Sequence, residues 1–100
     1  HLNNAYYAYD KGDCDRVMIE LSKVDRDSRA RRYIQPEVSM LRGQCLERQK
    51  LFLDAAQTYQ YILAQHPSSE YAYRARARLE TLQQLGHLRA MPAQPKPAPL

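Results

Sequence analysis

The sequence predicts an all-α protein in which helical hairpins stack side by side as a solenoid. Apolar residues recur at helical spacing through most of the chain, and short breaker segments divide it into five candidate helices. Glycine is scarce and the prolines gather toward the C-terminal end. The chain also repeats itself at an interval of about one hairpin. We therefore expect two hairpins and one capping helix in residues 1–86, followed by a Pro/Ala-rich disordered tail in residues 87–100.

Length and composition limit what this chain can be. Its 100 residues suffice for one modest hydrophobic core. No stretch approaches the roughly 20 apolar residues that span a bilayer, so we expect the chain to be soluble as given. The net charge of +4 comes from interspersed acids and bases, which indicates a mildly basic surface. The chain opens without a cleavable leader, and we expect His1 to be an interior point of a longer protein, in which case any signal or lipid anchor would lie upstream of the given residues.

The two cysteines, Cys14 and Cys45, are expected to be small core residues. They are too few for a disulfide scaffold, and they lack the paired spacing of zinc or redox sites. A bridge between them would need Cα atoms within about 7 Å of each other. The repeat leaves the two positions about one helical turn out of register, so the bridge is the alternative interpretation.

The first hairpin is expected to begin with a helix over residues 2–11, which carries small Ala5 and Ala8 on one face. Gly12 ends this helix, and Asp13 is a suitable N-cap for the next one. The second helix has apolar residues at helical spacing, namely Val17, Leu21 and Val24. These features predict two antiparallel helices.

An internal repeat relates this hairpin to the following one. A shift of 38 residues takes Ala5 onto Gly43 and Leu21 onto Tyr59. The segment between the hairpins, residues 25–36, is rich in arginine. Pro36 is expected to be the first residue of the third helix and to disfavour helix at the residue before it.

The stretch from Gly43 to Ser69 carries the clearest pattern. Small Gly43 allows close approach of a second helix, Leu46 and Phe52 flank a turn, and Pro67 ends the helix that follows. The apolar positions of that helix are Ala55, Tyr59 and Ile62. The pattern resembles the tetratricopeptide repeat, a pair of antiparallel helices of about 34 residues. This resemblance implies a concave groove that binds extended or helical peptides.

A fifth helix is expected to begin after Ser68 or Ser69 as N-cap and to end at Gly86. A shift of 34 residues takes Val38 onto Ala72, so this helix repeats the docking face of the third. It has no partner helix and is expected to cap the solenoid. The tail that follows is expected to be extended and solvated, with binding to an aromatic groove as the alternative.

The repeat also predicts which side chains face the concave groove. Tyrosine beside arginine is typical of contact surfaces, and two exposed tyrosines one turn apart have no obvious structural need. We predict that the partner-binding residues are Tyr6, Tyr9, Asp10, Gln44, Glu47, Arg48, Arg74 and Arg78. A possible secondary basic patch in the segment between the hairpins consists of Arg26, Arg29, Arg31 and Arg32.

Other functional classes find less support in the sequence. The places where one tetratricopeptide subclass carries a carboxylate clamp hold unsuitable residues, namely Leu2, Tyr6, Leu41, Tyr71 and Ala75. No histidine stands beside a nucleophile or a second metal ligand, and no glycine-rich phosphate loop occurs. We therefore expect no enzyme, no cofactor and no metal. Nucleic-acid binding is not expected, but eleven arginines keep it as an alternative from another class.

Residues 59–79 resemble the repeats of bacterial envelope lipoproteins, in which a tyrosine-rich helix is followed by proline, serine and a tyrosine-alanine pair. The resemblance implies a periplasmic domain, anchored in the outer membrane in the full-length protein, that binds and regulates another protein. The best specific expectation is activation of a peptidoglycan synthase, a penicillin-binding protein. Outer-membrane or pilus assembly is the alternative, and self-association through the solenoid ends is a further possibility.

Overall fold

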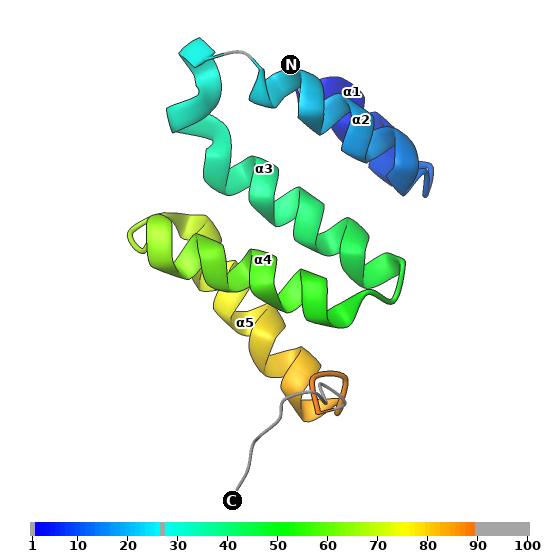
Figure 1. Ribbon diagram of the computed structural model, residues 1–100, viewed down its shortest axis with the longest axis vertical. Coiled ribbons are helices and arrows are strands. Elements are labelled where there is room, and N and C mark those ends of the chain that lie inside the picture. The colour runs from blue at the N-terminus through cyan, green and yellow to red at the C-terminus, as the bar shows by residue number, and fades with distance from the viewer. Residues whose placement is uncertain (1, 27, 90–100) are drawn as a thin grey trace, which may run out of the picture.

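The computed structural model describes residues 2–26 and 28–89, with the backbone alone described over residues 28–33. These residues form five α-helices and no strand, which confirms the predicted all-α class (Figure 1). The helices are α1 (Asn3–Asp10), α2 (Cys14–Asp25), α3 (Ser28–Arg48), α4 (Phe52–Gln65) and α5 (Glu70–Gln84). Residues 90–100 lie outside this description, so the disorder expected there stays a prediction.

The helices stack in chain order. α1 packs against α2, α2 against α3, and α3 against α4, while α5 packs on α4 and also touches α3. Figure 1 shows the two hairpins side by side, with α3 in the middle and α5 closing the stack. The described residues therefore form a solenoid-like stack of two hairpins and one terminal helix, as the sequence predicts.

The central helix α3 contributes to two hydrophobic clusters, one on each side. The first cluster joins α3 to the first hairpin and contains Ala5, Ala8, Cys14, Val17, Leu21, Val24, Val38, Leu41 and Cys45. The second joins α3 to α4 and α5 and contains Met40, Ala55, Tyr59, Ile62, Ala72, Ala75 and Leu82. Because α3 is needed by both clusters, it is the element on which the stack depends.

The helices α1, α3 and α5 all end in the same way. The residue that closes each one has a positive φ, namely Gly12 (79°), Lys50 (65°) and Gly86 (84°). The next amide then donates to a carbonyl five residues back, at 2.9 Å from Asp13 to Ala8, 2.9 Å from Leu51 to Leu46 and 3.0 Å from His87 to Leu82. This is the Schellman arrangement, which satisfies helix-terminal carbonyls and usually requires glycine.

The start of α3 differs from the prediction. Pro36 was expected to begin this helix and to exclude Gln35 from it, but α3 begins at Ser28 and contains both. A proline inside a helix removes one backbone hydrogen bond and bends the helix. Figure 1 shows the N-terminal part of α3 set at an angle to the rest. Pro36 is buried and Ile34 packs on the first cluster, so tertiary packing offsets the lost bond.

The predicted caps of α2 and α5 are confirmed. The Asp13 carboxylate accepts a hydrogen bond from the Arg16 amide at 3.1 Å, and the Ser69 hydroxyl accepts one from the Ala72 amide at 3.2 Å. Each cap satisfies a donor that the first helical turn leaves unpaired. Both helices therefore begin where local chemistry alone places them.

Packing continues past residue 86, where the folded region was expected to end. The ring of His87 stacks on the ring of Phe52 with 3.9 Å between centroids. Leu88 packs against the second hydrophobic cluster. The turn that follows α5 thus folds back onto α4 and belongs to the packed body.

Cys14 and Cys45 form a disulfide, with Cα atoms 5.5 Å apart, so the interpretation of two separate core residues is wrong. Both residues are buried in the first cluster, and the bond ties the start of α2 to α3. The expected offset came from sequence intervals. The two helices belong to different hairpins, and only their packing places the two cysteines opposite each other.

Candidate functional site

One face of the molecule is formed by α1, α3 and α5. Five side chains from these helices surround a hollow of about 260 Å³, namely Tyr9, Gln44, Glu47, Arg48 and Arg78. All five belong to the predicted partner-binding set. We call this surface the α1-α3-α5 face.

A network of one ion pair and its hydrogen bonds connects α3, α4 and α5 beneath this face. Arg78 on α5 donates from Nε to Glu47 Oε2 at 2.9 Å and from Nη2 to Glu47 Oε1. The Tyr59 hydroxyl on α4 donates to the same carboxylate. Burial alone would raise the pKa of Glu47, but the hydrogen bonds from Arg78 and Tyr59 outweigh it and hold the pKa below its ordinary value. Glu47 is therefore an ionised link between α3, α4 and α5.

Arg48 connects α3 to α1. Its guanidinium lies over the Tyr9 ring, 3.8 Å from the centroid, and Nη1 donates to the Tyr9 carbonyl at 2.8 Å. The side chain nevertheless stays exposed. Stacking and one hydrogen bond thus hold this cation in place while its other N–H groups face solvent.

A second tyrosine-arginine pair lies on α5. The Arg74 guanidinium is 5.3 Å from the centroid of the Tyr71 ring, and the Tyr6 hydroxyl donates to Glu37 nearby. Burial, followed by the hydrogen bond to Glu37, raises the pKa of the Tyr6 phenol. Burial and the charge of Glu37 raise the pKa of Tyr71 in the same direction. These four groups therefore share one local electrostatic environment.

The structure changes the interpretation of the two α1 tyrosines. Both have intramolecular partners, since Tyr6 bonds Glu37 and Tyr9 carries Arg48, so the expectation that they lack a structural need is wrong. Asp10 is exposed at the end of α1 and does not line the hollow.

The sequence prediction missed Glu37 and Tyr71. Helical spacing held the signal, because Glu37 lies seven residues before Gln44, and Tyr71 lies three before Arg74. Because the helix was expected to start at Pro36, Glu37 was placed at a helix end and was not recognised as lying on the same helix face as Gln44.

The predicted basic patch between the hairpins stays a prediction. Arg26 is exposed at the C-terminal end of α2. The side chains of Arg29, Arg31 and Arg32 lie outside the described part of the chain.

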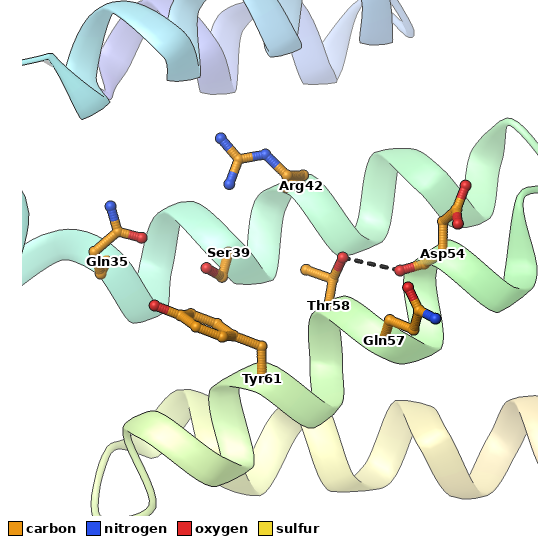
Figure 2. A pocket seen from close by; sticks show the side chains of 7 residues that line it. All are labelled: Gln35, Ser39, Arg42, Asp54, Gln57, Thr58 and Tyr61. Carbon is orange, nitrogen blue, oxygen red and sulfur yellow. Dashed lines mark hydrogen bonds between the residues drawn. The ribbon is translucent and has the colours of Figure 1, made fainter.

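A second hollow, of about 420 Å³, lies on the other side of α3. It is lined by side chains of α3 and α4, namely Gln35, Ser39, Arg42, Asp54, Gln57, Thr58 and Tyr61 (Figure 2). Residues 42 and 44 are two positions apart, or about 200° around a helix, which places this hollow away from the α1-α3-α5 face. All seven lining side chains are polar. No member of this set was predicted.

Within residues 2–26 and 28–89, no group of three or more histidine, cysteine, aspartate and glutamate side chains is arranged to hold a metal ion. In the same part of the chain, no helix is both long and apolar enough to cross a membrane.

Comparison with known proteins returned no match to any family model, to any curated protein or to any solved structure.

Proposed function

We propose that this chain is a non-catalytic interaction module that binds a segment of a partner protein on the α1-α3-α5 face. The observation that carries the proposal is the pair of exposed arginines stacked on tyrosine rings, Arg48 over Tyr9 and Arg74 over Tyr71. A guanidinium that is already ordered loses less entropy when it binds a carboxylate. The resemblance to tetratricopeptide repeats supports the same face, since those repeats bind peptides on their first helices.

The partner segment is expected to be acidic or amphipathic. Glu47 neutralises Arg78, so the cations available to a partner are Arg48 and Arg74. The neighbouring tyrosine rings offer apolar surface beside each cation. A helix or strand that alternates carboxylates with apolar side chains would satisfy both features.

A pair of model peptides tests this proposal. An amphipathic helical peptide rich in Glu and Leu should bind the protein, as measured by fluorescence anisotropy, and the same peptide with Lys in place of Glu should bind much more weakly. The double substitution Arg48→Ala and Arg74→Ala should weaken binding by roughly tenfold or more. Arg76→Ala, also exposed on α5, is the matched control and should leave binding unchanged. Equal affinity for both peptides would contradict the proposal.

We further propose that the full-length protein works in the bacterial envelope. Disulfides persist in oxidising compartments, so the bond between Cys14 and Cys45 supports a location outside the cytosol. Together with the resemblance to envelope lipoproteins, this favours a periplasmic domain anchored in the outer membrane. The best specific role is activation of a peptidoglycan synthase, and outer-membrane or pilus assembly is the alternative within the same class.

The specific role has its own test. A purified penicillin-binding protein should polymerise glycan strands faster with the wild-type domain than with the Arg48→Ala, Arg74→Ala variant. If neither protein changes the rate, this role is wrong, while peptide binding on the α1-α3-α5 face can still hold.

Nucleic-acid binding has less support. Arg78 and Arg42 are paired with Glu47 and Asp25, which lowers the positive charge that a phosphate backbone would meet. Filter binding at two salt concentrations separates this alternative from the main proposal. Strongly salt-dependent retention of unrelated RNAs would favour it.

A further inference from the structure

The second hollow, between α3 and α4, is lined by polar side chains that come from both helices. Its volume of about 420 Å³ falls within the range of roughly 300–1,000 Å³ that small-molecule sites occupy. Figure 2 shows the Tyr61 hydroxyl directed toward α3 and the Arg42 side chain extending from α3 on the side away from α4. The lining side chains are Gln35, Ser39 and Arg42 from α3 and Asp54, Gln57, Thr58 and Tyr61 from α4. Together these seven side chains supply hydroxyl, amide, guanidinium and carboxylate groups.

Two of the α3 side chains are held in place by a residue of α2. Asp25 on α2 accepts a hydrogen bond from Gln35 Nε2 at 2.9 Å and another from Arg42 Nη2 at 3.1 Å. The Gln35 side-chain oxygen and the other N–H groups of Arg42 are left for a ligand. The site thus presents an oriented acceptor and oriented donors before anything binds.

Ser39 provides an independent sign of a missing partner. The residue is only 3% exposed and lines the hollow. Within the described chain, its hydroxyl makes no hydrogen bond, whereas the hydroxyls of Ser22, Thr58 and Thr81 each donate to the carbonyl four residues earlier. A buried hydroxyl without a partner is costly unless something else completes it.

The charge of the hollow argues against an anion. Asp25 offsets Arg42, while the carboxylate of Asp54 has no ion-pair partner among the described residues. The balance is neutral to slightly negative, so a phosphate or a carboxylate would be repelled.

The lining also argues against a peptide. A groove that binds a peptide gains affinity from pockets for apolar side chains, and no aliphatic side chain among the described residues lines this hollow. Its carbon-rich surface is the ring of Tyr61, which is 46% exposed.

We propose that this hollow binds a neutral saccharide. A sugar ring carries adjacent hydroxyls that pair with the planar ends of Gln35, Arg42, Asp54 and Gln57, and its C–H face can lie on the Tyr61 ring. The Ser39 hydroxyl gains its missing partner from the same ligand. The proposal uses a different side of α3 from the α1-α3-α5 face and does not depend on the function proposed for that face.

A titration with neutral trisaccharides tests the proposal. Chitotriose, maltotriose and cellotriose are added separately to ¹⁵N-labelled protein, and amide shifts are followed by NMR. At least one sugar should shift residues of α3 and α4 around the hollow. Tyr61→Ala should weaken that binding roughly tenfold, and Tyr73→Ala, whose ring is 79% exposed on α5, should leave it unchanged.

Ser39→Ala separates binding from folding. Because the hydroxyl has no protein partner, its removal should keep the unfolding midpoint within error while weakening sugar binding by roughly 3- to 10-fold. The Arg48→Ala, Arg74→Ala variant should bind sugar as the wild type does. Each sugar is added to about 20 mM, which is roughly 20 times the dissociation constant of a weak site with a Kd of about 1 mM. No shift with any of the three sugars at that concentration overturns the proposal. So does a neutral Gly-Ser-Asn peptide that shifts these residues when the sugars do not.

Discussion

At the scale of single residues, the absence of one methyl group at Gly43 sets how closely α4 approaches α3. A Cβ at this position would lie 2.5 Å from Cε1 of Tyr59, which is closer than any real contact. Tyr59 is the largest of the fully buried side chains, and its hydroxyl donates a hydrogen bond to Glu47. The contact with Gly43 and the bond to Glu47 therefore depend on the same placement of one ring.

Gly43→Ala should destabilise the protein by about 1–3 kcal/mol, because the ring of Tyr59 must move and strain its bond to Glu47. In an exposed helix the same change would stabilise by roughly 0.5–1 kcal/mol. Urea unfolding followed by circular dichroism measures the free energy of unfolding of the variant and of the wild type. An unchanged or higher free energy of unfolding would show that Tyr59 does not need the space.

Glu47→Gln should remove part of the acid sensitivity of the fold. The pKa of Glu47 is lower in the folded chain than its ordinary value of 4.5, so the ionised group stabilises the protein above that pH, and this contribution is lost as the pH falls. The variant should be less stable by about 1 kcal/mol at pH 7, a modest figure because Arg78 is partly solvated. Its stability should also fall less between pH 5 and pH 3.

The control for this measurement is Glu80→Gln, an exposed carboxylate on α5. It should follow the wild-type dependence on pH. Equal acid sensitivity of Glu47→Gln and the wild type would contradict the network.

At the scale of elements, α1, α3 and α5 share one way of ending, yet only α3 does so without glycine. The shift of 38 residues that relates the hairpins takes Gly12 onto Lys50, and both have positive φ. A lysine in this conformation is strained, since its Cβ crowds the backbone. The turn between α3 and α4 forms because tertiary packing and the Schellman bonds outweigh that cost.

Lys50→Gly should therefore stabilise the protein by about 0.5–1 kcal/mol, although glycine usually weakens a fold. Arg76→Gly, at an exposed site inside α5, is the control and should destabilise by about 1 kcal/mol. Thermal unfolding of the two variants provides the comparison. A lower melting temperature for Lys50→Gly would contradict the assigned strain.

The disulfide acts between elements, because it ties α2 to α3 across a sequence separation of 31 residues. Closing a loop of that length in the unfolded chain corresponds to roughly 2–4 kcal/mol of stability. Calorimetry with and without reductant should show a lower melting temperature after reduction. The Cys14→Ser, Cys45→Ser variant should melt near the reduced protein and ignore reductant. Free thiols in the native oxidised protein would refute the bond.

At the scale of the whole molecule, α3 joins two clusters and separates two surfaces. The α1-α3-α5 face and the hollow between α3 and α4 use opposite stripes of the same helix. The first surface takes residues from α1 and α5 as well as α3, and the second, although lined by one hairpin, has Gln35 and Arg42 held by Asp25 on α2. Both proposed binding sites therefore depend on the complete stack.

Two neighbouring leucines test where the packed body ends. Leu88→Ala should lower the free energy of unfolding by about 1 kcal/mol, because Leu88 packs on the second cluster. Leu85→Ala, at a residue that is 63% exposed, should change it by less than about 0.5 kcal/mol. Equal effects in chemical denaturation would place the end of the body at residue 86, as the sequence predicts.

Prediction from sequence succeeded where short-range spacing carries the information. Gly43 was expected to admit a second helix closely, and Tyr59 does pack against it. Asp13 and Ser69 cap the helices as expected, because a cap depends on three or four consecutive residues. The prediction failed at Pro36, where packing of Ile34 on the first cluster competes with the local preference of proline and wins.

By itself the sequence determined the helical class, most helix ends and all five side chains around the 260 Å³ hollow, because each follows from the period of a helix and from the repeat. Only the tertiary structure decided that Cys14 meets Cys45, that Glu47 holds Arg78 and Tyr59 together, and that a polar hollow opens between α3 and α4. Those features depend on how helices from different parts of the chain cross and approach. That geometry is set by packing, which no interval along the sequence expresses.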